Sequence, residues 1–296
     1  MTFSFFKKRS DSFDYEITRI CKACGNMFHG RYCNRCSEKV TEPHERSVLS
    51  FMESLLNAFT FLDGKFIKSL KLVLTKPGAL SRSIADGVQT PFMKMVSLFF
   101  VANFFYFLFP VMDSFNSSLH TQMNLLGAHS PRAERIVNEE LVKKNISLEK
   151  FTVKYETQST NFSKLLLILL AIMFTLFLMV VNYSRKVYFF DHLLFSMEFY
   201  SFLILVGLVI IPMVALWIIK AALTNGMDWR YVLSDNIYYP MILVMLGYFL
   251  FRSQLIFYKQ KWYWAIPKSM ILLFLMGKSW WIYRILLFYI TMWWIE

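Results

Sequence analysis

The sequence lacks the short motifs that usually reveal an enzyme. It contains no HExxH helix, no GxSxG nucleophile turn and no glycine-rich phosphate loop. It also lacks a basic stripe interleaved with exposed aromatic residues, so its net charge of +12 is weak support for nucleic-acid binding. No long apolar core follows the basic residues of the N-terminus, which argues against a cleavable signal peptide. We therefore expect a non-enzymatic protein that does not bind nucleic acid.

Polar and apolar residues are segregated along the chain. The protein has 296 residues, of which 56% are hydrophobic, and its mean hydropathy is +0.42. All four cysteines precede residue 37, whereas most apolar residues follow residue 91. The first long apolar run, Met95–Met112, has no charge over 18 residues and as a helix would span roughly 27 Å, close to a bilayer's hydrocarbon core. The pattern predicts an all-α integral membrane protein with a polar N-terminal head.

The head contains two cysteine pairs in a CxxC-x8-CxxC arrangement, and its metal-ligating candidates are Cys21, Cys24, Cys33 and Cys36. Each pair places two thiolates on one turn, and the spacing between the pairs suffices for a hairpin that brings them together. We expect residues 1–46 to hold the N-terminal tail and a zinc ribbon with one structural Zn²⁺. A rubredoxin-like iron site, two disulfides and free thiols are the alternatives.

Residues 47–91 are expected to form short amphipathic helices on the cytoplasmic side of the membrane. Ser47–Phe61 and Lys65–Thr75 carry apolar residues at helical spacing, and Ala79–Ala85 follows a Pro-Gly break. Basic amphipathic helices beside a membrane span usually lie on the anionic leaflet. Packing against the membrane body or a partner is the alternative, and the two arrangements are compatible.

This part of the chain resembles a known family. Several short motifs follow one another in a fixed order: Cys24-Gly25, Tyr32-Cys33, Asp63-Gly64, Thr75-Lys-Pro77-Gly78, Gly87 and Pro91. This order resembles that of an uncharacterised bacterial membrane family, domain of unknown function 3667. The layout resembles the five-span Yip1-type proteins more distantly. The resemblance implies a short zinc ribbon, a Pro-Gly segment, a multi-span body and a place in the bacterial inner membrane. It implies no catalytic residue set.

The body, residues 92–296, is expected to cross the membrane about five times. After Met95–Met112 we expect a polar outside loop, 113–163, in which Glu134–Lys144 could form a solvated helix. The other four crossings are predicted at Leu165–Val181, Leu193–Ile219, Ile237–Phe251 and Ser269–Ile295. The last of these could instead be two half-helices that meet near Gly277, because it contains Lys278 and Arg284.

Loop charges orient this arrangement. Loops 182–192 and 252–268 carry net charges of +1 and +4, whereas loops 113–163 and 220–236 both sum to zero. Because basic loops stay in the cytoplasm, we expect the N-terminus inside and the C-terminus outside.

Several ionisable residues fall within or beside the predicted crossings, and the candidates for an intramembrane polar site are Asp191, His192, Glu198 and Lys278. A charge inside a bilayer is costly, so such residues usually pair with one another or act in transport. Counting depth at 1.5 Å per residue, we expect Glu198 to pair with Lys278 and Arg284 to reach the outer interface. A metal or acid–base site is a further alternative.

Taken together, these features predict a non-enzymatic multi-pass membrane protein. Its zinc ribbon and interfacial helices would form a platform for regulation or partner docking. The partners expected are the lipid bilayer and either another protein or a second copy of the chain. A small-molecule or ion transporter or channel subunit that uses Glu198 and Lys278 is the alternative, followed by an intramembrane enzyme.

Overall fold

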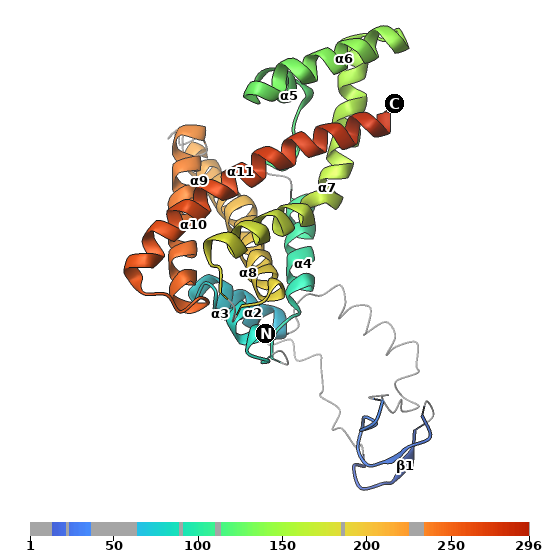
Figure 1. Cartoon of the computed structure of the whole chain (residues 1–296), viewed down its shortest axis with the longest axis vertical. Helices are drawn as coiled ribbons and strands as arrows, with labels where there is room; N and C mark the ends of the chain where they lie inside the picture. Colours follow the sequence, from blue (N-terminus) through green and yellow to red (C-terminus); the bar gives the residue numbers. More distant parts are fainter. Residues whose placement is uncertain are drawn as a thin grey trace. The chain divides into compact units, whose positions relative to one another are not determined.

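The computed structural model (Figure 1) describes residues 14–21, 24–36, 64–88, 91–109, 114–184, 187–224 and 234–295. The chain divides into two compact units, Met1–Asp63 and Gly64–Glu296. The predicted helix Ser47–Phe61 lies outside the described residues.

The first unit contains a small two-stranded hairpin. Strands β1 (Arg19–Ile20) and β2 (Met27–Phe28) pair antiparallel, with Ile20 opposite Met27. The turn between them includes Gly25 at a φ of 70°, a backbone conformation that glycine adopts without strain. The amide of Gly25 donates to the carbonyl of Cys21 at 2.9 Å, which closes the turn around the first cysteine pair.

The described residues of the second unit form helices joined by turns and short irregular segments, with no strand among them. In chain order its helices are α2 (Gly64–Thr75), α3 (Ala79–Ala85), α4 (Met95–Leu108), α5 (Leu119–Asn124), η2 (Gly127–His129), α6 (Ser130–Lys144), α7 (Leu148–Val181), α8 (Phe189–Phe202), η3 (Leu203–Ile210), α9 (Ile211–Thr224), α10 (Asp235–Ile256) and α11 (Trp262–Ile295). The all-α class is confirmed. η3 is a π-helix that joins α8 to α9 without a break.

Among the residues that the structure describes, four helical segments are long and apolar enough to cross a membrane: Leu148–Val181, Phe189–Thr224, Asn236–Ile256 and Trp262–Ile295. The remaining predicted crossing corresponds to α4, which has 14 residues and a length of roughly 21 Å. It is shorter than the ~20 residues that a bilayer core requires. The last crossing is one continuous helix through Gly277, so the two half-helices are not observed.

The polar segment 113–163 was expected to be a loop, and that expectation was wrong for most of its length. It holds α5, η2, α6 and the first sixteen residues of α7. Together with the end of α11, these helices surround a second apolar cluster. Figure 1 shows the C-terminal end of α11 beside α7. The polar residues are therefore one face of a packed helical layer, and α6 includes the helix expected at Glu134–Lys144.

Helix α8 occupies the centre of the bundle and packs against α4, α7 and α3. Residues 194–202 are all buried, so the helix has no exposed face over this stretch. Aromatic rings fill the surrounding core; Phe199 stacks on Phe174 at 5.0 Å and contacts Phe249 edge-on at 5.8 Å. A polar side chain on this part of α8 must therefore find its partners inside the protein.

Helices α2 and α3 pack against this body, which was the alternative to a purely leaflet-bound arrangement. Val73, Leu80 and Ile84 are buried and join the main core cluster. The helix bounds agree with those expected from sequence, Lys65–Thr75 and Ala79–Ala85.

The second cluster contains a buried histidine. His129 meets the rings of Phe288 and Tyr289 edge-on, at centroid distances of 5.1 and 5.6 Å. Burial, with the nearby Arg132 guanidinium, lowers the pKa of His129 below its ordinary value. The folded protein therefore holds this ring neutral more strongly than the unfolded chain does.

Protonation of His129 should weaken this cluster. Because its folded pKa lies below its unfolded pKa, the unfolded state binds the proton first, and stability is lost as the pH falls through about 6.5. Thermal unfolding of the wild type and of His129→Gln between about pH 7.5 and about pH 5 should show a smaller pH dependence in the variant. Equal pH dependence of the two proteins would contradict the prediction.

Candidate metal centre and the buried carboxylate of Glu198

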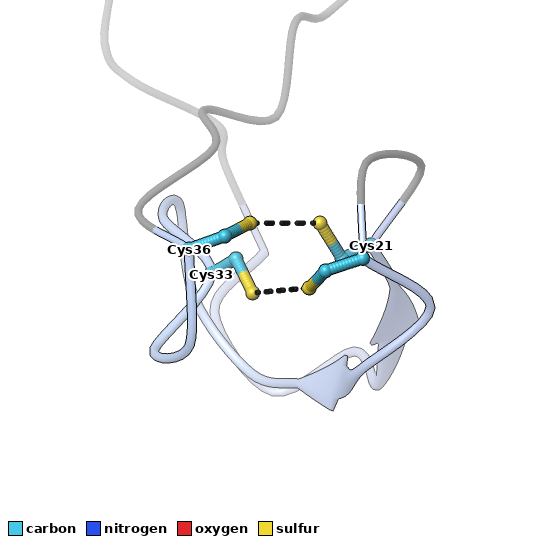
Figure 2. A group of neighbouring side chains, drawn as sticks. Cys21, Cys33 and Cys36 are labelled. Atoms are coloured by element: carbon cyan, nitrogen blue, oxygen red, sulfur yellow. Dashed lines mark hydrogen bonds between the residues drawn. The ribbon is translucent and has the colours of Figure 1, made fainter.

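The four cysteines of the first unit converge on one point. The Sγ atoms of Cys21 and Cys36 lie 3.4 Å apart, and those of Cys24 and Cys33 lie 3.7 Å apart. All four sulfurs lie within 4.8 Å of one another. Figure 2 shows Cys33 and Cys36 facing Cys21 across the centre. Each of these two close contacts joins a cysteine of the first CxxC motif to one of the second. Both motifs are therefore needed to form the cluster.

These distances fit a tetrahedral metal site. A tetrahedral ion with metal–sulfur bonds of about 2.3 Å separates its sulfurs by about 3.8 Å. A disulfide requires about 2.05 Å, and all four cysteines are free thiols. The cluster is therefore able to hold one metal ion.

The local backbone also favours the thiolate form of one cysteine. Backbone N–H groups, that of Cys36 foremost, lower the pKa of Cys33 to about 6 against the opposing effect of burial. A thiolate is the metal-ligating form of cysteine. Cys21 and Cys33 are buried beside Phe28, whereas Cys36 is exposed. The sequence prediction thus identified every member of this cluster.

Glu198 is the second feature that the sequence singled out, and its side chain is completely buried in the bundle. One carboxylate oxygen accepts a hydrogen bond from the backbone N–H of Gly78 at 2.9 Å. The other accepts from the backbone N–H of Ser81 at 2.8 Å and from the Ser81 hydroxyl. These N–H groups belong to the first turn of α3, where a helix leaves its amides unpaired.

Gly78 is required at this contact for two reasons. Its φ is +81°, in the left-handed region. A Cβ atom there would also lie 3.0 Å from the Cα of Ser253 and 3.2 Å from the Cβ of Phe257. The Pro-Gly segment thus passes close to the end of α10 while it presents its amide to Glu198.

The expected pairing of Glu198 with Lys278 was wrong. Lys278 is exposed, and its Nζ lies over the ring of Phe274, 5.2 Å from the centroid. No ion pair joins it to Glu198 among the residues that the structure describes. The prediction counted how deep each residue lies along its helix, which put Glu198 and Lys278 within reach of each other. Such a count does not give the direction in which each side chain points.

The other two candidates have separate partners. An Asp191 carboxylate oxygen accepts from the Tyr188 amide at 2.9 Å and caps α8. The Nδ1 of His192 lies 2.8 Å from the Tyr258 hydroxyl. Within the described part of the chain, the only group of three or more potential metal ligands is the cysteine cluster. Asp191, His192 and Glu198 therefore do not converge on a single site.

Sequence reasoning missed Gly78 and Ser81 as the partners of Glu198. The available signal was a buried carboxylate together with a Pro-Gly break before a short helix, since such a helix start supplies unpaired N–H donors.

No family model, curated protein or solved structure matches the chain. Function must therefore be inferred from the cysteine cluster and the contacts of the body.

Replacing Glu198 by Gln should destabilise the protein without a loss of volume. The amide keeps one acceptor oxygen but turns an NH₂ group toward the N–H donors of α3, so one charged hydrogen bond is lost and two donors face each other. We expect a loss of about 1.5–3 kcal/mol of unfolding free energy. Thermal unfolding in detergent would measure it.

Glu139→Gln is the control, because Glu139 is exposed on α6 and the same change there should leave stability nearly unaltered. Unfolding of Glu198→Gln at the wild-type temperature would show that the α3 contact contributes little.

Proposed function

We propose that this protein is a non-enzymatic multi-pass membrane protein whose N-terminal zinc ribbon docks a protein partner. Exposed apolar residues on the hairpin beside the cysteine cluster carry the proposal. Ile20 and Met27 are register partners on β1 and β2, and they are 70% and 69% exposed. Exposed apolar side chains that gather on so small a unit mark an interaction surface.

A four-cysteine centre supports docking rather than catalysis. Four thiolates complete a tetrahedral coordination sphere and leave no position for water or substrate. A segment of this size buries little apolar surface, so metal binding would contribute much of its folding free energy. Cys21, Cys24, Cys33 and Cys36 would hold the ion, and its role would be to keep Ile20 and Met27 in register.

Zinc is the metal that we propose, at one ion per chain. Elemental analysis of purified protein should find about one zinc and little iron, as expected for four-thiolate coordination. Cys24→Ser combined with Cys36→Ser removes one ligand from each CxxC and should abolish metal binding. Retention of wild-type zinc by this double variant would disprove the assignment.

Docking can be tested apart from metal binding. Ile20→Ser combined with Met27→Ser should keep the zinc but lose the partner, because it removes only exposed apolar area. The measurement is quantitative mass spectrometry of proteins retained by the full chain in mild detergent. Val142→Ser is the control, since it changes a residue of the second unit that is 84% exposed.

A partner counts only if the hairpin variant loses it and the control keeps it. An identical set of retained proteins from all three chains would contradict docking through this face.

The transporter alternative receives less support. It needs Glu198 and Lys278 to face a common pathway, whereas Glu198 is hydrogen-bonded to α3 and Lys278 contacts Phe274. Their separate contacts favour structural roles for both.

We also propose that α4 is a fifth membrane helix, with the N-terminus in the cytoplasm and the C-terminus outside. One side of α4 is buried against the bundle and the other exposes Val96, Phe100 and Phe104, as a helix at the edge of a lipid-facing bundle would. The loop charges favour this orientation. We further propose that the protein lies in the bacterial inner membrane and belongs to the domain-of-unknown-function family. The motif order in the sequence is the support for both statements.

Single cysteines introduced at Val142 and Tyr183 test the orientation, because these side chains are 84% and 82% exposed. An impermeant thiol reagent added to intact cells should label position 142 and not position 183, because the proposed topology places them on opposite sides. Labelling of position 183 from outside would reverse the assignment.

A further inference from the structure

The membrane body contains a cavity of about 410 Å³ that the functions considered so far do not use. It lies among η3, α10 and α11, and its lining includes Leu203, Leu246, Met276, Gly277 and Arg284. The volume falls within the range of about 300–1,000 Å³ typical of small-molecule sites. Because α10 and α11 are candidate membrane-spanning helices, a ligand could enter from the bilayer.

Two departures from regular helix structure lie at or beside this cavity. Its η3 wall is an eight-residue π-helix, a form that occurs frequently at functional sites. The Tyr238 hydroxyl, on α10, donates to the carbonyl of Gly207 in that π-helix. Pro240 interrupts the hydrogen bonding of α10 two residues later. The cavity is thus built by local irregularities of its walls.

Gly277, on the α11 wall of the cavity, lacks a side chain. A Cβ atom at Gly277 would meet no other atom within 4 Å. Close helix packing therefore does not explain this glycine. Its effect is to leave space in the cavity.

The cavity has a polar end and an apolar end. Tyr238 lies near the start of α10 and Arg284 in the second half of α11, and both line the cavity. Arg284 donates from a terminal nitrogen to the carbonyl of Ser114 at 3.4 Å, and Ser114 and Tyr239 line the cavity with it. Met276 lies eight residues before Arg284, or roughly 12 Å along the helix.

We propose that this cavity binds the acyl chain of an amphipathic lipid and holds its oxyanion head group at Arg284. The apolar lining matches a hydrocarbon chain, and a guanidinium binds a carboxylate or phosphate through two parallel hydrogen bonds. A guanidinium has five N–H donors, so it can serve both the Ser114 carbonyl and a head group. Charge complementarity selects an acidic lipid over a neutral one.

The test uses the full chain in detergent and a palmitic acid analogue with a photoreactive diazirine in its chain. Mass spectrometry should map the crosslinks to the cavity walls on η3, α10 and α11, and excess unlabelled palmitate should compete. The methyl ester of the same probe should label about tenfold less, as expected for loss of a charged hydrogen bond. Crosslinks elsewhere, or equal labelling by acid and ester, would overturn the proposal.

Variants separate the two ends of the cavity. Gly277→Phe should fill the apolar end and reduce labelling by about tenfold or more, whereas Gly277→Ala should retain most of it. Leu243→Phe, on the opposite wall, is a second filling variant if Gly277→Phe fails to fold. Arg284→Gln should remove the preference for the acid over the ester.

Ile271→Phe is the matched control, because it enlarges an exposed side chain of α11 outside the cavity. Wild-type labelling of both filling variants, or an acid preference that survives Arg284→Gln, would show that the lipid does not bind here.

Discussion

The burial of one carboxylate constrains much of the membrane body. Glu198 sits on a helix with no exposed face over residues 194–202, so water cannot solvate its charge. An unpaired charge in a bilayer costs at least about 2.5–3.5 kcal/mol on insertion scales. The backbone N–H groups of Gly78 and Ser81 and the Ser81 hydroxyl offset that cost. The start of α3 must therefore stay against α8 whenever Glu198 is ionised.

That contact explains the segment before α3. Gly78 must present its amide to Glu198 while its α-carbon approaches Ser253 and Phe257 on the other side. A residue with a side chain would be strained in backbone conformation and would collide with α10. The Pro-Gly break, which in the sequence only ended a helix, is thus the point where α3, α8 and α10 meet.

The sequence predicted local features well and long-range partners poorly. Helical periodicity placed α2 and α3, and the CxxC spacing identified all four cysteines of the cluster. The partners of Glu198 lie about 120 residues away, and two of its three hydrogen bonds come from backbone amides. Backbone donors are present at every non-proline residue, so no residue type marks them. Opposite charge pointed to Lys278, which faces elsewhere.

The polar segment 113–163 shows a different limit of prediction from sequence. Its balanced charges resemble those of a solvated loop, yet Phe151, Tyr155, Ser159 and Ser163 are buried at four-residue intervals along α7. That interval is one face of a helix, so the signal was present but carried by only two apolar residues. Their partners, Phe288 and Met292, lie on the last helix, and only the folded chain brings them together.

Intramembrane ionisable residues are usually the first candidates for transport or catalysis. Asp191 caps its own helix, His192 contacts Tyr258, and Glu198 holds α3, so the partners present give each of them a structural role. Two apolar features lack such an internal explanation: the exposed Ile20 and Met27 beside the cysteines, and the space left by Gly277. The buried charge of Glu198 positions a helix, and recognition is better sought at the surface or volume that is left unfilled.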